Sequence, residues 1–183
     1  MRLPASLSLA TQRGIDLMIY ILGALLLACT LAAAVYRRMQ RRPEDAGRIM
    51  SRDMLAGAAI FAFVGPAVGM QVIAVTTAIA SQDPELLLFG LYGLPWAYIF
   101  GGVPALFCGM TAGALKPVAP NWVAILRMGL IGAAYAFIFL MTFGTNDRTL
   151  ESLGFPLFMG ALPAAVAGLL CARVLYGKPV AVR

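Results

Sequence analysis

The chain of 183 residues contains no histidine and few charged residues. Lysine, arginine, aspartate and glutamate make up 12% of it, against about a quarter in an average soluble protein. Without histidine, the chain cannot ligate haem through an imidazole or use an imidazole for acid–base catalysis. Every carboxylate lies in a loop or at the edge of an apolar stretch, so no paired acids are available there for catalysis or metal binding. We therefore expect no enzyme activity, no metal and no cofactor.

Cysteine is also scarce. Cys29, Cys108 and Cys171 each lie in an apolar stretch, without the paired spacing of a redox or metal site. We interpret them as small buried hydrophobes. Cys29 has a second interpretation, because Leu26-Leu27-Ala28-Cys29 follows a basic residue and an apolar run, like a poor lipoprotein processing site. The apolar run continues beyond this cysteine to a pair of arginines, which favours an uncleaved helix.

Apolar residues, by contrast, make up 61% of the sequence. They gather in stretches long enough to cross the hydrocarbon layer of a bilayer, which is about 30 Å thick and needs about 20 residues of helix. We predict an all-α integral membrane protein, a single domain of residues 1–183 that forms a five-helix transmembrane bundle in the lipid bilayer. The residues before the third span, 86–93, are expected at the outer surface. The predicted spans are about 15–36, 54–80, 95–115, 122–143 and 155–176.

Basic residues are concentrated on one side of the predicted spans. The sequence carries fourteen basic and eight acidic residues, a net charge of +6. Eleven of the basic residues fall in the 37–53 loop, around the loop between the third and fourth spans, or in the C-terminal tail, and three fall on the other side. Because cytoplasmic loops carry the excess of lysine and arginine, we expect the N-terminus outside and the C-terminus inside. The distribution explains the positive charge without a nucleic-acid partner.

The cytoplasmic basic loop, residues 37–53, contains six arginines. Such a segment attracts anionic lipid head groups, at about 1 kcal/mol per basic residue near the surface. It either only sets the topology or also docks a cytoplasmic partner or a specific lipid. Arg52, Arg127 and Arg173 lie at the predicted inner ends of three spans. Their guanidinium groups either snorkel to the head groups or bind a lipid phosphate or a substrate anion.

Small residues recur at every fourth position in two spans. Residues four apart share one face of a helix, and small faces let two helices approach closely in lipid. A face exposed to lipid would indicate a partner, whereas a face buried within the chain would be internal packing. The predicted packing residues are Gly93, Ala97, Gly101, Ala105, Gly109 and Gly113 in the third span, and Gly160, Ala164, Gly168 and Ala172 in the fifth.

Two pairs of spans share a longer pattern. In the third and fifth spans, Gly101-x-x-Pro104-Ala105-x-x-x-Gly109 matches Gly160-x-x-Pro163-Ala164-x-x-x-Gly168. In the second and fourth, Arg52-x-x-Leu55-x-Gly57 matches Arg127-x-x-Leu130-x-Gly132. One leading helix followed by two duplicated helical hairpins would produce these matches. Because apolar segments use few residue types, coincidence would also produce them.

A proline stands inside each of three spans, at Pro66, Pro104 and Pro163. Proline removes one backbone hydrogen bond and kinks a helix, so Pro104 frees the carbonyl of Phe100 and Pro163 frees that of Met159. In a bundle, such carbonyls either coordinate a cation or polar solute, or are satisfied by a neighbouring hydroxyl or water.

A wider pattern runs through the second and third spans. Phe63-x-Gly65-Pro66, followed by Tyr98-x-x-Gly101-Gly102-x-Pro104-Ala105, resembles small uncharacterised multi-spanning inner-membrane proteins of Gram-negative bacteria. The resemblance covers these two spans only. It implies a location in the bacterial cytoplasmic membrane and implies no activity.

Two classes of function remain. Coupled transport usually places an ionisable residue in the membrane interior, and the predicted spans have none at their centres. We therefore expect a non-catalytic integral membrane protein that acts by helix–helix packing, as an accessory, assembly or immunity-type subunit. Its partner would be another membrane protein or a second copy of itself. The alternative is a passive conduit or transporter subunit for a small solute or ion, formed by the kinked hairpins or by a homo-oligomer.

Overall fold

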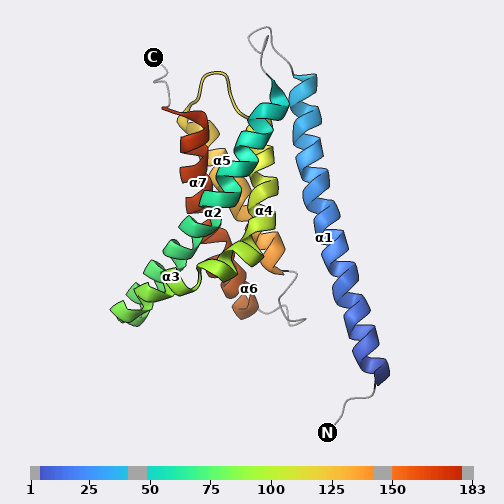
Figure 1. Ribbon diagram of the computed structural model, residues 1–183, viewed down its shortest axis with the longest axis vertical. Coiled ribbons are helices and arrows are strands. Elements are labelled where there is room, and N and C mark those ends of the chain that lie inside the picture. Colours follow the sequence, from blue (N-terminus) through green and yellow to red (C-terminus); the bar gives the residue numbers. More distant parts are fainter. Residues whose placement is uncertain (1–4, 41–48, 142–149, 179–183) are drawn as a thin grey trace.

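The computed structural model describes residues 5–40, 49–141 and 150–178, and these are helical segments with no strand among them (Figure 1). In the described part of the chain, five stretches are long and apolar enough to cross a membrane: Tyr20–Met39, Met50–Ser81, Leu94–Ala114, Trp122–Met141 and Leu153–Tyr176. The prediction of a multi-spanning all-α membrane protein is confirmed. The elements are α1 (Ala5–Met39), α2 (Met50–Ser81), the 3₁₀ helix η2 (Pro84–Leu88), α3 (Phe89–Tyr92), α4 (Leu94–Ala114), α5 (Trp122–Met141), α6 (Leu150–Pro156), the π-helix η3 (Leu157–Ala161) and α7 (Leu162–Tyr176).

Two helices begin earlier than the sequence predicted. α1 begins at Ala5 instead of about residue 15, and α2 begins at Met50 instead of residue 54. The chain has no proline between Pro4 and Pro43, so no residue interrupts a helix that starts directly after Pro4. The two helices therefore include both ends of the predicted 37–53 loop. Residues 41–48 of that loop, and the predicted end of the fourth span at 142–143, lie outside the described residues.

α2 is too long for a perpendicular crossing. Its 32 residues extend about 48 Å at 1.5 Å per residue, against about 30 Å of hydrocarbon. Figure 1 shows α2 inclined across the bundle, so that its C-terminal turns, η2 and α3 project to one side. Gln82, in the left-handed conformation, ends α2, and Asp83 caps η2 by accepting the amide of Glu85 at 3.0 Å. The segment predicted at the outer surface, 86–93, thus forms short helices before α4.

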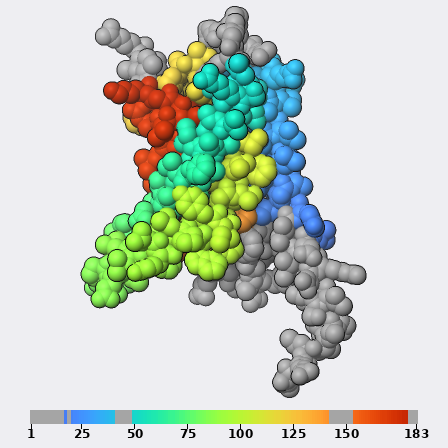
Figure 2. Space-filling view, in the orientation of Figure 1, coloured from blue at the N-terminus to red at the C-terminus, as the bar shows by residue number. Residues whose placement is uncertain are grey.

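The bundle is built from two helical hairpins. α4 packs along α2, α7 packs along α5, and α2 also packs on α7 and so joins the hairpins. In the space-filling view, the side chains of α2, α4 and α7 form one continuous surface (Figure 2). Buried apolar side chains fill the centre, among them Phe61, Cys108, Met128 and Cys171. The two hairpins of the sequence repeat therefore exist in space, and their origin by duplication stays a hypothesis.

α1 is attached to this bundle along one face. It packs on α4, and its buried side chains Leu22, Leu26 and Thr30 are spaced by four residues. Large side chains elsewhere on α1, such as Tyr20 and Leu31, are exposed. In Figure 1 the beginning of α1 diverges from the other helices. A single face of α1 thus holds it to the rest of the chain.

The connections alternate between the two ends of the bundle. η2, α3 and α6 lie at the end where α1 begins, and the starts of α2 and α5 lie at the opposite end with the end of α7 (Figure 1). This arrangement is the one that five successive crossings require. Which end faces the cytoplasm stays a prediction from the basic residues.

Candidate functional site

Glycines bring the backbones of α2 and α4 into contact. A Cβ atom on Gly57 would overlap the carbonyl oxygen of Gly109, and a Cβ on Gly109 would overlap that of Gly57. A Cβ on Gly113 would overlap the carbonyl oxygen of Asp53, in the first turn of α2. Any larger residue would push the helices apart. Gly109 and Gly113, from the face predicted on the third span, thus lie against the second span of the same chain.

α5 and α7 meet through glycines as well. A Cβ on Gly132 would lie 2.8 Å from the carbonyl oxygen of Ala164, and a Cβ on Gly168 would lie 2.9 Å from that of Met128. Both distances are too short for a carbon atom beside a backbone oxygen. Gly168, from the face predicted on the fifth span, therefore lies against the fourth span.

The two hairpins differ in contact register by one helical turn. A Cβ on Gly57 comes closest to Gly109, and Gly168 is the residue that matches Gly109 in the sequence repeat. A Cβ on Gly132, the match of Gly57, comes closer to the carbonyl oxygen of Ala164, at 2.8 Å, than to Cα of Gly168, at 3.7 Å. The closest contact has moved by about four residues, or one turn. The hairpins share glycine contacts without sharing one contact pattern.

The other members of the two predicted faces have several different neighbours. Ala172 is fully buried, and Ala97 and Ala164 line a cavity that lies between the hairpins. The small faces are thus in use within the chain. The contacts of the remaining members are Gly93 with Met70, Gly101 with Pro66, Ala105 with Gly65, and Gly160 with Leu140 and Ala136.

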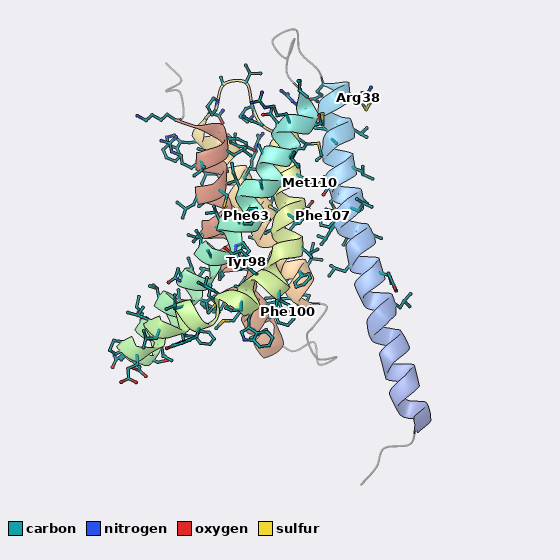
Figure 3. The ribbon with its side chains drawn as sticks, viewed as in Figure 1. Arg38, Phe63, Tyr98, Phe100, Phe107 and Met110 are labelled. Carbon is teal, nitrogen blue, oxygen red and sulfur yellow. The ribbon has the colours of Figure 1, made fainter. Side chains whose placement is uncertain are left out.

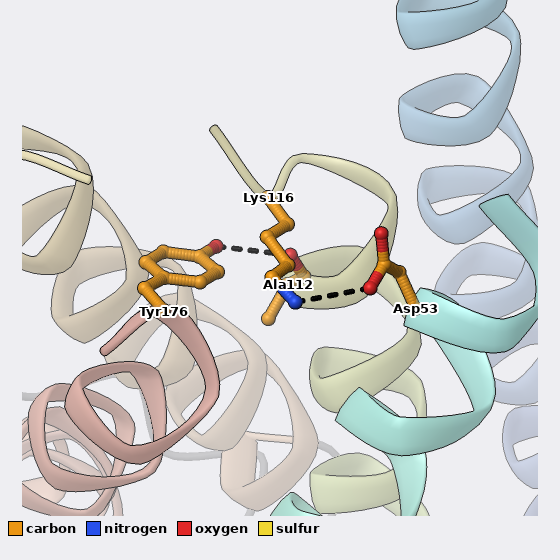
Figure 4. A network of polar contacts seen from close by, with 4 residues as sticks. All are labelled: Asp53, Ala112, Lys116 and Tyr176. Atoms are coloured by element: carbon orange, nitrogen blue, oxygen red, sulfur yellow. Dashed lines mark hydrogen bonds and ion pairs between the residues drawn. The ribbon is translucent and has the colours of Figure 1, made fainter. Parts of the chain in front are cut away.

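Two polar contacts tie α2, α4 and α7 together at one end of the bundle (Figure 4). Nζ of Lys116, which follows α4, lies 3.0 Å from Oδ1 of Asp53 in α2. The hydroxyl of Tyr176, at the end of α7, donates to the carbonyl oxygen of Ala112 at 2.9 Å. Ala112 lies in the last turn of α4, where backbone carbonyls lack amide partners within the helix. Tyr176 therefore caps α4.

The three arginines that were predicted to contact lipid or an anion lie toward this same end. Arg52 is in the first turn of α2, Arg127 is in the second turn of α5, and both side chains are exposed. Arg173 is half-buried in the last turn of α7. Its guanidinium lies 5.9 Å from the ring centroid of Trp122 and donates to the carbonyl of Gly177. Arg173 is therefore engaged with the protein, whereas Arg52 and Arg127 are exposed.

Hydroxyl groups connect α1, α4 and α5. Oγ1 of Thr111 lies 3.4 Å from Oγ1 of Thr30 and 3.1 Å from the hydroxyl of Tyr135, and all three side chains are buried. Thr30 and Thr111 also donate within their own helices, to Leu26 and Phe107. In the described part of the chain, no buried side-chain nitrogen or oxygen lacks a hydrogen-bond partner. This cluster satisfies itself, as buried polar groups in lipid must.

Two further bonds join α2 to the segment that follows it. The hydroxyl of Tyr98 in α4 donates to the carbonyl oxygen of Phe63 at 2.5 Å, one turn before Pro66 (Figure 3). The side-chain amide of Gln71 donates to the carbonyl oxygen of Gly90 in α3 at 2.9 Å. The Tyr98 bond therefore holds α4 against the part of α2 before its proline, and the Gln71 bond holds α3 against the part after it.

A cavity of about 220 Å³ lies between the two hairpins. α2, α4, α5, η3 and α7 all contribute to its wall. Pro66, Pro104 and Pro163 all line it, although 97 residues of sequence separate the first from the last. Phe100 and Met159, whose carbonyls the prolines are predicted to free, line it as well. The structure therefore brings all three prolines to one place.

Glycines leave space around these prolines without touching a neighbouring backbone. A Cβ on Gly101 would lie 3.8 Å from Cβ of Pro66, and a Cβ on Gly69 would lie 3.9 Å from Cβ of Pro163. Both are ordinary van der Waals distances. Pro163 is the second residue of α7, which directly follows the π-helix η3. Single π-helical turns are frequent at functional sites.

The lining of the cavity is almost wholly apolar and includes no charged residue. The hydroxyl of Tyr135, one of the lining residues, is engaged with Thr111. Apolar cavities of about 150 Å³ stay dry and bind small apolar molecules. This cavity is therefore suited to an apolar ligand and not to an ion.

Some of these residues could not be identified from the sequence. Phe61, a large residue, follows Gly57 one helical turn later on the same face. The sequence therefore shows no stripe of small residues that would mark Gly57 as a packing residue. Asp53 and Lys116 are 63 residues apart, and no local pattern links them. Within the described residues, no group of three or more His, Cys, Asp or Glu side chains is placed to hold a metal ion.

The chain was also compared with known proteins. Protein-family models, curated protein sequences and solved structures gave no match. The candidate features therefore rest on their own geometry: the glycine contacts within each hairpin, the loosely held α1, and the apolar cavity.

Proposed function

We propose that this chain is a non-catalytic membrane protein that acts by helix–helix packing, as an accessory, assembly or immunity-type subunit of the bacterial cytoplasmic membrane. Its partner would be another membrane protein or a second copy of the chain. The observation that supports this proposal best is an uncovered face of small residues on α1.

α1 has two opposite faces of different kinds. Leu22, Leu26 and Thr30 are buried on the side of α4. Two residues farther along from each of these, and so about 200° around the helix axis, stand three exposed small residues, Ala24, Ala28 and Ala32. The exposed face therefore points away from the bundle.

This face differs from the small faces of α4 and α7, which already have neighbours within the chain. In lipid, two helices have no hydrophobic drive to associate, and close backbone approach supplies the attraction. Small residues four apart permit that approach. A second helix could therefore pack on Ala24, Ala28 and Ala32 without disturbing any contact inside the bundle.

The proposed orientation places the N-terminus outside and the C-terminus inside. It brings the exposed side chains of Arg52 and Arg127 to the inner surface, where anionic head groups attract basic residues. Snorkelling of both guanidinium groups is compatible with the same contact. Lipid contact at this end would therefore hold the depth of the bundle while α1 carries the partner.

The alternative function, a passive conduit, has less support from the geometry. A path for ions or polar solutes needs polar groups along it to replace water. The cavity between the hairpins is apolar, and the buried hydroxyls near it bond to each other and to backbone carbonyls. A pore formed by several copies would use other surfaces.

The test is purification in mild detergent from native membranes, followed by mass spectrometry of the intact assembly. Ala28→Leu places a large side chain on the exposed face of α1, and Ala134→Leu places the same side chain at an exposed position of α5. We expect the original chain and Ala134→Leu to retain a stoichiometric partner or second copy, and Ala28→Leu to lose it.

Two results would contradict the proposal. If the original chain leaves the membrane as a monomer without a stoichiometric partner, no packing function is supported. If Ala28→Leu and Ala134→Leu retain the partner equally, the partner does not pack on α1.

A further inference from the structure

The motif shared by α4 and α7 lines one cavity in addition to making helix contacts. In both copies, the first three positions of the motif line the same cavity. These positions are Gly101, Pro104 and Ala105 in α4, and Gly160, Pro163 and Ala164 in η3 and α7. The repeated pattern therefore contributes to the wall of one cavity from two separate helices.

The rim of this cavity lies at bilayer depth. Phe100 and Met159 both line it, and their side chains are 50% and 36% exposed. Each is the seventh residue of its candidate span, about 9 Å along the helix from the start. At that depth a membrane protein is surrounded by acyl chains and not by water. An occupant that enters past these two residues therefore comes from the lipid phase.

The interior offers an occupant almost no polar surface. Met70 and Cys108 line the cavity and are 6% and 3% exposed, and the Tyr135 hydroxyl bonds to Thr111. A head group, an ion or a polar solute would lose its hydration there without compensation. An alkyl chain has no hydration to lose, and it would make the dispersion contacts that an empty space forfeits.

The volume limits the occupant to part of a lipid. At about 220 Å³ the cavity is larger than the cavities of about 150 Å³ that hold benzene. It is smaller than the pockets of about 300–1,000 Å³ that enclose a whole drug-sized ligand. We propose that it binds the terminal part of one acyl chain of a membrane phospholipid, which enters past Phe100 and Met159. This site is independent of the partner face on α1.

The glycines supply matched variants. Gly101 lines the cavity, and a Cβ there meets Pro66 only at ordinary distance, so Gly101→Leu adds a side chain at the cavity wall. Gly102 is not among the lining residues, and a Cβ there has nothing within 4 Å. Gly102→Leu is therefore the control. Gly69→Leu adds a side chain at the wall from α2 and serves as a second filling variant.

The experiment is photolabelling in vesicles of phosphatidylcholine that contain a phospholipid with a diazirine near the end of one acyl chain. After irradiation, mass spectrometry maps the labelled residues. Labels on the buried residues Met70 and Cys108 report the cavity, and labels on Leu130 and Val174, which are 71% and 65% exposed, report surrounding lipid. We expect both sets in the original chain and in Gly102→Leu.

In Gly101→Leu or Gly69→Leu, we expect the cavity labels to fall by about tenfold while the surface labels stay unchanged, a loss of about 1.4 kcal/mol in binding. If the original chain carries surface labels but no cavity labels, the proposal is overturned. The occupant of the cavity would then be a side chain of a partner protein. Cavity labels that persist in both filling variants would also overturn the proposal. If neither variant folds, the labels in the original chain decide alone.

Discussion

Gly57 and Gly109 are in direct backbone contact, so that a Cβ atom on either residue would overlap the carbonyl oxygen of the other. This contact fixes where α4 lies along α2. Pro66, nine residues after Gly57 in α2, lies beside Gly101, eight residues before Gly109 in α4, at the cavity wall. Because the two helices are antiparallel, the glycine contact at one end of the hairpin determines which residues face each other at the cavity.

Gly109→Leu should destabilise the protein by about 3 kcal/mol, the upper end of the range for overpacking a core. The added side chain would meet the backbone of Gly57, which cannot move aside as a flexible side chain can. Gly23→Leu is the matched control, since a Cβ at Gly23 in α1 has nothing within 4 Å. The measurement is unfolding in mixed detergent micelles. Equal effects of the two substitutions would show that the α2–α4 contact does not limit the fold.

Tyr176→Phe should destabilise the bundle by about 1–3 kcal/mol, because it leaves the carbonyl of Ala112 at the end of α4 without its donor. Tyr92→Phe, at an exposed residue of α3, should change stability by less than about 0.5 kcal/mol. The same unfolding assay compares them. A Tyr176→Phe protein as stable as the control would mean that water or another donor reaches the carbonyl.

The pair Asp53–Lys116 should show a coupling energy of about 0.5–1 kcal/mol in a double-mutant cycle. The variants are Asp53→Asn, Lys116→Gln and both together, because each substitution removes a charge and leaves a polar side chain. The two side chains are 20% and 24% exposed, so added salt should weaken the coupling only in part. Strictly additive effects would show that the 3.0 Å contact contributes no stability.

The membrane spans could be predicted from the sequence because the length and apolar character of a crossing are local properties of the chain. The starts of α1 and α2 could not, because a helix can extend beyond its apolar stretch and the apolar pattern does not mark where it begins. Gly109 and Gly168 were predicted to pack on another helix, but spacing on one helix does not say which helix it meets. Ala24, Ala28 and Ala32 have the same four-residue spacing but were not identified, and the folded chain adds that all three are exposed.

By itself, the sequence determined that this is a multi-spanning helical membrane protein, because burying its apolar residues requires lipid and satisfying their backbone there requires helices. It also placed a proline in each of three spans. Only the tertiary structure decided that Pro66, Pro104 and Pro163 line one cavity and that the α1 alanines face outward. Both depend on how helices far apart in sequence cross. Glycines that let two backbones touch set the crossing within each hairpin, and Leu22, Leu26 and Thr30 set the side of α1 that meets α4.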